Sequence, residues 1–167
     1  MCVAKCTFGV IDILDRTAPP GLTAPQTVRR ILVGFDGSPG AHAALARAIN
    51  IAVSQNARLT IAAVVPEVRW CAGFGMMVMP VSPETLRRDA EREMLRHLAE
   101  ARDEVPADVS LTTQLLYGRP ARALAKLADA GDYDLVITGP RPIRRLPRLG
   151  VTRSLLSRTR ASVLAIR

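Results

Sequence analysis

Short apolar runs alternate with helix-like segments through the last 138 residues of this 167-residue chain. A run with no polar alternation is typical of a strand buried on both faces of a parallel sheet. Chains that alternate strand and helix in this way place their helices on the two faces of such a sheet. We therefore predict an α/β fold: a five-stranded parallel sheet covered by helices on both faces, with flavodoxin-like or nucleotide-binding layering. The five predicted strands are Ile31–Phe35, Leu59–Val65, Val109–Leu116, Asp134–Thr138 and Ser162–Ile166.

The segments between these runs carry helix-start signals. Ser38 and Ser82 each precede a proline, and Pro120 follows Gly118-Arg119. A serine accepts a backbone N–H at the N-cap, and proline fits the first helical position. These patterns predict three long helices, and residues 151–159 are expected to form a short fourth one.

The organisation predicted is one domain, residues 29–167, preceded by a flexible extension over residues 1–28. The end of that extension is rich in Pro and Thr and has no hydrophobic period. No apolar run reaches the roughly 18–20 residues of a membrane span, and the N-terminus does not resemble a secretory signal. The cysteines Cys2, Cys6 and Cys71 form no disulfide framework and no zinc spacing. These features favour a cytoplasmic protein without a metal or a membrane partner.

Positive charge is concentrated at the C-terminal end. Residues 1–138 hold 15 basic and 15 acidic side chains, whereas residues 139–167 hold eight arginines and no acidic residue. Such a local excess can attract phosphate or another polyanion. A solvated, arginine-rich surface explains the same composition. Nucleic-acid binding is not expected, because no recognition motif is present.

Five segments together point to one known family. They read ILVGFDGS (31–38), LTIAAVVP (59–66), GRP (118–120), YDLVITG (133–139) and SVLAIR (162–167). In this order and spacing they resemble the universal stress protein family from about residue 30 to residue 167. The resemblance implies a strand order of 3-2-1-4-5, a homodimer, a cytoplasmic location and a role in stress responses. One branch of that family binds ATP and another does not.

A ligand site is expected where the strand order reverses, since doubly wound sheets bind ligands beyond the carboxyl ends of their strands at that point. For order 3-2-1-4-5, the reversal lies between the first and fourth strands, which end near Asp36 and Gly139. Asp36 could accept hydrogen bonds from a nucleotide, or simply form the turn before a helix. The resemblance places Val64 at the position that contacts the base, although a core role is the favoured explanation of Val64. His42 and His97 are expected to be solvated bystanders.

The predicted phosphate loop departs from the ATP-binding branch of the family. That branch carries Gly, two residues, Gly, nine residues, Gly, then Ser or Thr, whereas this chain reads GPRPIRRLPRLGVT (139–152). Gly139 matches, but Pro142 replaces the second glycine, Gly150 comes two residues early, and Thr152 follows it one place late. Prolines also lack the N–H groups that a phosphate needs. ATP is therefore a possible cofactor, but the sequence of this loop disfavours ATP binding.

Arginines could compensate for these missing donors through charge-assisted bonds to phosphate. The four candidates are Arg141, Arg144, Arg145 and Arg148. Three functions thus remain open: a stress-response binding or signalling module with unknown protein partners, an adenine-nucleotide-binding member, or a polyanion binder. No arrangement of nucleophile, base or paired carboxylates suggests catalysis beyond weak ATP turnover.

The last predicted strand is expected at an exposed edge of the sheet, and apolar edges require covering. The resemblance implies that this edge pairs with the same edge of a second copy. The candidate dimer residues are Ser162, Val163, Leu164, Ala165 and Ile166.

Overall fold

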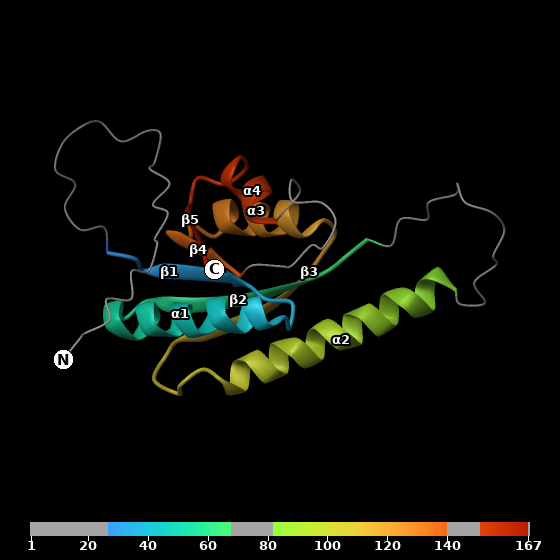
Figure 1. Cartoon of the computed structure of the whole chain (residues 1–167), viewed down its shortest axis with the longest axis horizontal. Coiled ribbons are helices and arrows are strands. Elements are labelled where there is room, and N and C mark those ends of the chain that lie inside the picture. Colours follow the sequence, from blue (N-terminus) through green and yellow to red (C-terminus); the bar gives the residue numbers. More distant parts are fainter. Residues whose placement is uncertain (1–26, 68–81, 140–150, 167) are drawn as a thin grey trace, which may run out of the picture.

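A computed structural model describes residues 27–67, 82–139 and 151–166 (Figure 1). The chain order of its elements is β1 (Arg30–Gly34), α1 (Pro39–Gln55), β2 (Arg58–Val65), α2 (Pro83–Asp103), β3 (Leu111–Tyr117), α3 (Pro120–Ala130), β4 (Leu135–Thr138), α4 (Val151–Leu156) and β5 (Ser162–Ala165). The predicted extension over residues 1–28 lies almost entirely outside the described residues, as does the arginine-rich loop of residues 140–150. No helix of the described ranges is long and apolar enough to cross a membrane.

The five strands form one parallel sheet in the order β3-β2-β1-β4-β5. Figure 1 shows α1 and α2 beneath this sheet and α3 and α4 above it. The predicted fold class is therefore confirmed, including the strand order that the family resemblance implied. The order reverses beside β1, which pairs with β2 on one side and β4 on the other.

Both faces of the sheet are buried, as the unbroken apolar runs predict. On β1, Ile31 and Val33 face the core under α1 and α2, while Leu32 faces the core under α3 and α4. All three side chains are fully buried. Burying an aliphatic side chain of this size contributes about 1.5–3 kcal/mol relative to leaving it in water.

Both serine caps form as predicted. The Ser38 hydroxyl accepts from the Ala41 N–H at 3.2 Å, and the Ser82 hydroxyl accepts from the Thr85 N–H at 3.2 Å. Each satisfies one of the amide donors that the first helical turn leaves open. At α3, Arg119 occupies the N-cap position and makes no side-chain cap.

Two predicted boundaries were wrong by two or three residues. β3 begins at Leu111 instead of Val109, because the Val109 N–H donates to the Pro106 carbonyl within a turn. Helix α4 ends at Leu156 instead of Thr159, since the Asp129 carboxylate accepts from both the Thr159 hydroxyl and the Arg160 N–H. These two bonds turn the chain out of α4 and toward β5.

Helix α2 is only partly covered by the sheet. Leu98 and Ala101 are buried, whereas Leu86, four residues into the helix, is 38% exposed. Figure 1 shows the reason: the N-terminal half of α2 extends past the ends of the strands.

Candidate functional site

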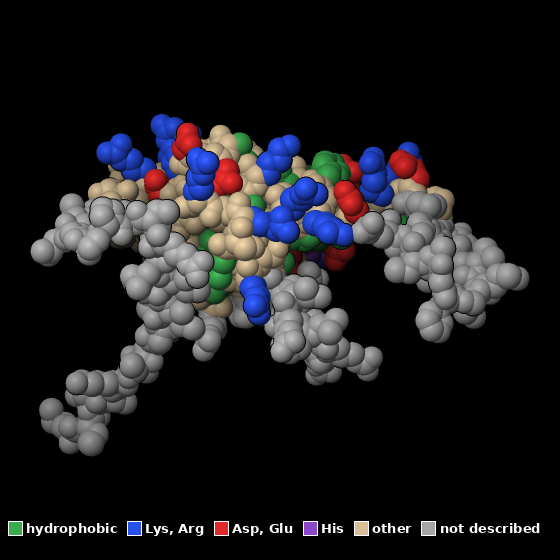
Figure 2. All heavy atoms as spheres, turned by 90° about the horizontal axis from the view of Figure 1, so that it is seen from above, with side chains coloured by type: hydrophobic (Ala, Val, Ile, Leu, Met, Phe, Trp, Pro, Cys, Tyr) green, Lys and Arg blue, Asp and Glu red, His purple; other side chains and the backbone are tan. Residues whose placement is uncertain are grey.

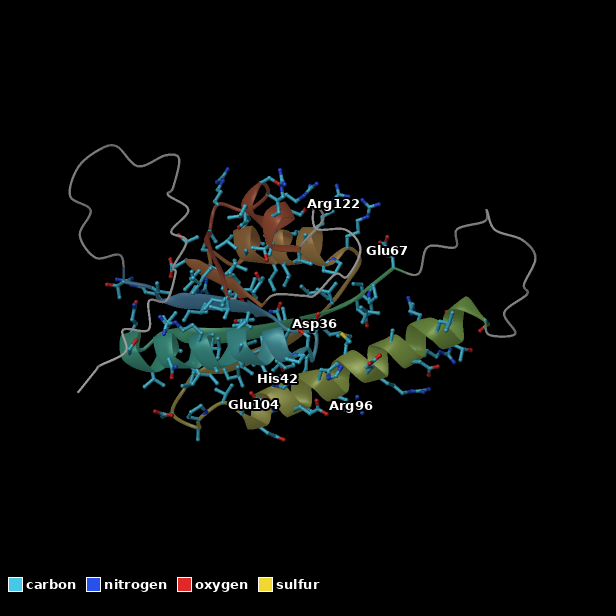
Figure 3. The ribbon with its side chains drawn as sticks, in the orientation of Figure 1. Asp36, His42, Glu67, Arg96, Glu104 and Arg122 are labelled. Carbon is cyan, nitrogen blue, oxygen red and sulfur yellow. The ribbon has the colours of Figure 1, made fainter. Side chains whose placement is uncertain are left out.

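The turn after β1 lies at the point where the strand order reverses. Gly34 of β1 is the register partner of Thr138 at the end of β4, so Asp36 and Gly139 follow two adjacent strand ends. Asp36 is partly buried, and its Oδ1 accepts from the Ser38 N–H at 3.1 Å. The structure thus gives Asp36 a role in the turn and also places it at the predicted ligand edge (Figure 3).

Two histidines pack around this turn, so the expectation that they are solvated bystanders was wrong. A Cβ added to Gly37 would overlap the His97 ring, and the His97 side chain is only 13% exposed. His42 packs edge-on against Phe35 with ring centroids 5.0 Å apart, and its Nδ1 lies 2.7 Å from Glu104 Oε1. The contact of His97 with the β1–α1 turn depends on the docking of α2, which single-helix patterns do not reveal.

Gly139 permits a close approach between β4 and α1. A Cβ added to Gly139 would overlap the carbonyl group of Gly40 in the first turn of α1. The absence of a side chain at residue 139 therefore allows the end of β4 and the start of α1 to touch. This close approach accounts for glycine at residue 139, and a phosphate ligand is not needed to explain it.

Thr152 reaches the same edge of the sheet from α4. The Oγ1 atoms of Thr138 and Thr152 lie 3.0 Å apart, and Thr138 is 4% exposed. This bond satisfies the hydroxyl of a buried threonine and holds the start of α4 over the end of β4. The described candidates Asp36, Gly139 and Thr152 thus meet at the ends of β1 and β4.

The remaining candidates divide into two groups. Val64 is partly buried and packs against the core under α3 and α4, as its core interpretation predicts. The others lie outside the described residues: Arg141, Arg144, Arg145, Arg148 and Gly150. Across the described ranges, no group of three or more His, Cys, Asp or Glu residues could hold a metal ion.

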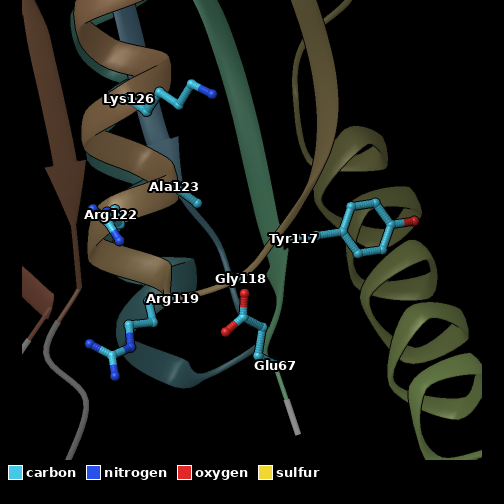
Figure 4. Close-up of a pocket in the computed structure, with 7 residues that line it drawn as sticks. All are labelled: Glu67, Tyr117, Gly118, Arg119, Arg122, Ala123 and Lys126. Atoms are coloured by element: carbon cyan, nitrogen blue, oxygen red, sulfur yellow. The ribbon is translucent and has the colours of Figure 1, made fainter. Parts of the chain in front are cut away.

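Sequence reasoning missed a cavity at the carboxyl ends of β2 and β3. Its volume is about 670 Å³ (Figure 4). The lining residues are Glu67, Tyr117, Gly118, Arg119, Arg122, Ala123 and Lys126. The sequence did contain one indication of this cavity: basic residues recur at 119, 122 and 126, and a helix places residues with this spacing on neighbouring turns.

Tyr117 connects the cavity to α2. Its hydroxyl donates to Glu91 Oε1 at 2.9 Å, and Figure 4 shows the ring directed away from α3 toward α2. This hydrogen bond to Glu91 raises the pKa of Tyr117, since ionisation of the phenol would break the bond and place two negative charges side by side.

The outer side of α3 and α4 is basic. Figure 2 looks onto this side and shows Lys and Arg side chains spread across it. Six exposed cations come from these two helices and the turn after α4: Arg119, Arg122, Lys126, Arg153, Arg158 and Arg160. The charge excess that the sequence places after residue 138 is therefore extended onto α3 by the fold.

β5 forms one edge of the sheet, as predicted. The Ser162 and Ile166 N–H groups donate to the β4-side carbonyls of Asp134 and Thr138. Because successive amides of a strand point to opposite sides, the Val163 and Ala165 N–H groups point out from the sheet edge. The candidates Ser162 and Ala165 are exposed, while Val163, Leu164 and Ile166 are partly buried against the two faces.

Comparisons with known proteins agree on one family. The model of the universal stress protein family matches residues 27–167. The chain is 30% identical over 166 residues to the stress response protein NhaX of Bacillus subtilis, covering 83% of this chain and 97% of that protein. A universal stress family protein from Burkholderia pseudomallei superposes with a TM-score of 0.67 at 25% identity, covering 86% of this chain and 98% of the other. A universal stress protein solved in complex with cAMP gives a TM-score of 0.63 at 23% identity, with coverages of 84% and 98%.

Proposed function

The chain belongs to the universal stress protein family, and on that premise we propose that it is a cytoplasmic, homodimeric stress-response binding module that does not bind ATP through a glycine-rich loop. The proposal makes β5 the dimer edge. Under this proposal, the residues at the carboxyl end of the sheet do not bind the triphosphate of ATP.

The hydroxyl pair of Thr138 and Thr152 carries this proposal. In the ATP-binding motif, a Ser or Thr directly follows the last glycine. Here Val151 stands at that position and Thr152 one place later, and the Thr152 hydroxyl already bonds to Thr138 at 3.0 Å. The Asp36 carboxylate likewise holds the Ser38 N–H. Both groups therefore already have partners within the chain, and exchanging one hydrogen bond for another would contribute little net free energy to nucleotide binding.

The test is to denature gently purified protein, identify any released small molecule by mass spectrometry, and titrate ATP into the stripped protein by calorimetry. We expect no released adenine nucleotide and no saturable heat at millimolar ATP, a range in which binding contributes only about 4 kcal/mol. Saturable binding that Asp36→Ala abolishes would contradict the proposal.

Adenine-nucleotide binding is the second candidate function. Two observations favour it: Asp36 and Thr152 both lie at the edge where the strand order reverses, and a family relative of the same fold was solved with cAMP. Under this function, calorimetry with cAMP and AMP would give saturable heat that is lost in Asp36→Ala and retained in Asp89→Ala, the same substitution at an exposed residue of α2. The absence of such heat would leave the first proposal standing.

The proposed dimer predicts a specific effect of proline on β5. The Ala165 N–H points away from β4, so Ala165→Pro removes a donor to the partner strand without removing a β4–β5 hydrogen bond. We expect the variant to remain folded by circular dichroism but to sediment as a monomer at micromolar concentration. Ala165→Thr keeps the N–H and serves as the control, which should remain dimeric. A dimer in Ala165→Pro would place the interface elsewhere.

A further inference from the structure

Three basic side chains line the cavity at the ends of β2 and β3. Arg119, Arg122 and Lys126 come from the N-cap and the first two turns of α3, and all three are exposed. Among the described residues, none of their side chains takes part in a hydrogen bond or ion pair. The nearest acid of their own helix, Asp129, is held by the Thr159 hydroxyl and the Arg160 N–H.

The acidic wall of the cavity does not neutralise these cations. Glu67 lies next to Gly118, whose added Cβ would come within 3.6 Å of Glu67 Oε1, and it forms no ion pair with a described residue. Glu91, the acid bonded to Tyr117, belongs to α2 and does not line the cavity; Figure 4 shows the Tyr117 ring directed toward that helix. The cavity lining therefore carries three positive charges and one negative charge.

We propose that this cavity binds a small phosphorylated molecule. Arg122 and Lys126 hold its phosphate, and Glu67 accepts a hydrogen bond from a hydroxyl or amino group of the same ligand. The site is separate from the crevice between β1 and β4 and goes beyond the function proposed above.

The spacing of the two cations fits a single phosphate group. Residues four apart on a helix lie on neighbouring turns with Cβ atoms about 5–6 Å apart, so both head groups can contact one phosphate. The arginine supplies paired N–H donors and the lysine a compact charge, which together form charge-assisted bonds to phosphate oxygens. The cavity volume of about 670 Å³ is that of a site for a small molecule.

The first test titrates inorganic pyrophosphate into the full chain by calorimetry at about 0.15 M salt, where the Debye length is about 8 Å. The double variant Arg122→Gln with Lys126→Gln is compared with the wild type, and glutamine preserves the helix propensity of both positions. We expect the variant to weaken binding by about tenfold or more, since hydrogen bonds to charged groups carry the interaction.

Arg47→Gln with Arg102→Gln is the matched control. These exposed arginines lie on α1 and α2, over the opposite face of the sheet, and form no ion pair with a described residue. The control removes the same charge and should leave pyrophosphate affinity within about twofold, because exposed charges at such distances are screened. If the two double variants lose the same pyrophosphate affinity, the net charge of the protein explains the binding, and the proposal is overturned.

Two single variants locate the ligand. Glu67→Gln should tighten pyrophosphate binding by about threefold, because it removes a like charge from the cavity wall. Asp36→Ala should leave that affinity within about twofold. Tightening in Asp36→Ala of the size expected for Glu67→Gln would instead place the anion between β1 and β4. Retention of a single-stranded oligonucleotide by a chain that shows no saturable pyrophosphate binding would also overturn the proposal.

Discussion

Replacing Gly139 with alanine is expected to lower the free energy of unfolding by about 2–3 kcal/mol. The added Cβ would overlap the backbone carbonyl of Gly40, and a backbone group in the first turn of α1 cannot rotate away as a side chain can. Relief requires β4 and α1 to separate, which would weaken packing between elements that share the α1–α2 core. Urea denaturation followed by circular dichroism measures the loss.

Gly34→Ala provides the matched control. Gly34 lies on β1 opposite Thr138, and its added Cβ would meet the Leu124 Cδ1 atom at 2.9 Å. That atom is the end of a side chain, so Leu124 can shift at a smaller cost of about 1 kcal/mol. If both variants lose the same stability, close contact between the two backbones is not the reason for glycine at residue 139.

Leu155→Ala is expected to destabilise the protein by about 2–5 kcal/mol. Leu155 is fully buried in the core under α3 and α4, where it packs with Leu124 and Val136. A six-residue helix such as α4 has little stability of its own, so its position depends on this tertiary packing. Loss of the anchor should also loosen Thr152, which starts the same helix beside Thr138.

A control variant at the neighbouring leucine distinguishes the loss of buried contacts from a change in helix propensity. Leu156 is 37% exposed, and Leu156→Ala makes the same chemical change one residue later in α4. We expect it to cost less than about 1 kcal/mol in a thermal or urea melt. Similar losses for the two leucines would show that α4 does not derive its position from the Leu155 contact.

Local chemistry explains why so much of the fold could be predicted. Apolar runs such as Ile31–Phe35 identify strands that are buried on both faces, and Ser38-Pro39 and Ser82-Pro83 identify helix starts through nearest-neighbour geometry. The boundary errors at Val109 and Thr159 arose where a turn or a distant carboxylate took over the backbone donors.

The candidate site was predictable only in outline. Asp36 and Gly139 were placed at the correct edge because parallel strands of a doubly wound sheet end together at the reversal of strand order. Their roles depended on partners far away in the chain. Gly139 faces Gly40, and His97 packs on Gly37 although the two residues belong to different helix–strand units.

The cavity of α3 illustrates the same limit. Its cations are visible in the sequence as residues 119, 122 and 126, but Glu67 joins them only because β2 and β3 are neighbours in the sheet. The amino-acid sequence alone determined the α/β class, the strand and helix segments and the helix caps, since these depend on hydrophobic period and on residues a few positions apart. The tertiary structure decided which polar groups bond to one another and which cations remain unpaired beside a cavity, because those pairings form only when distant strands and helices pack together.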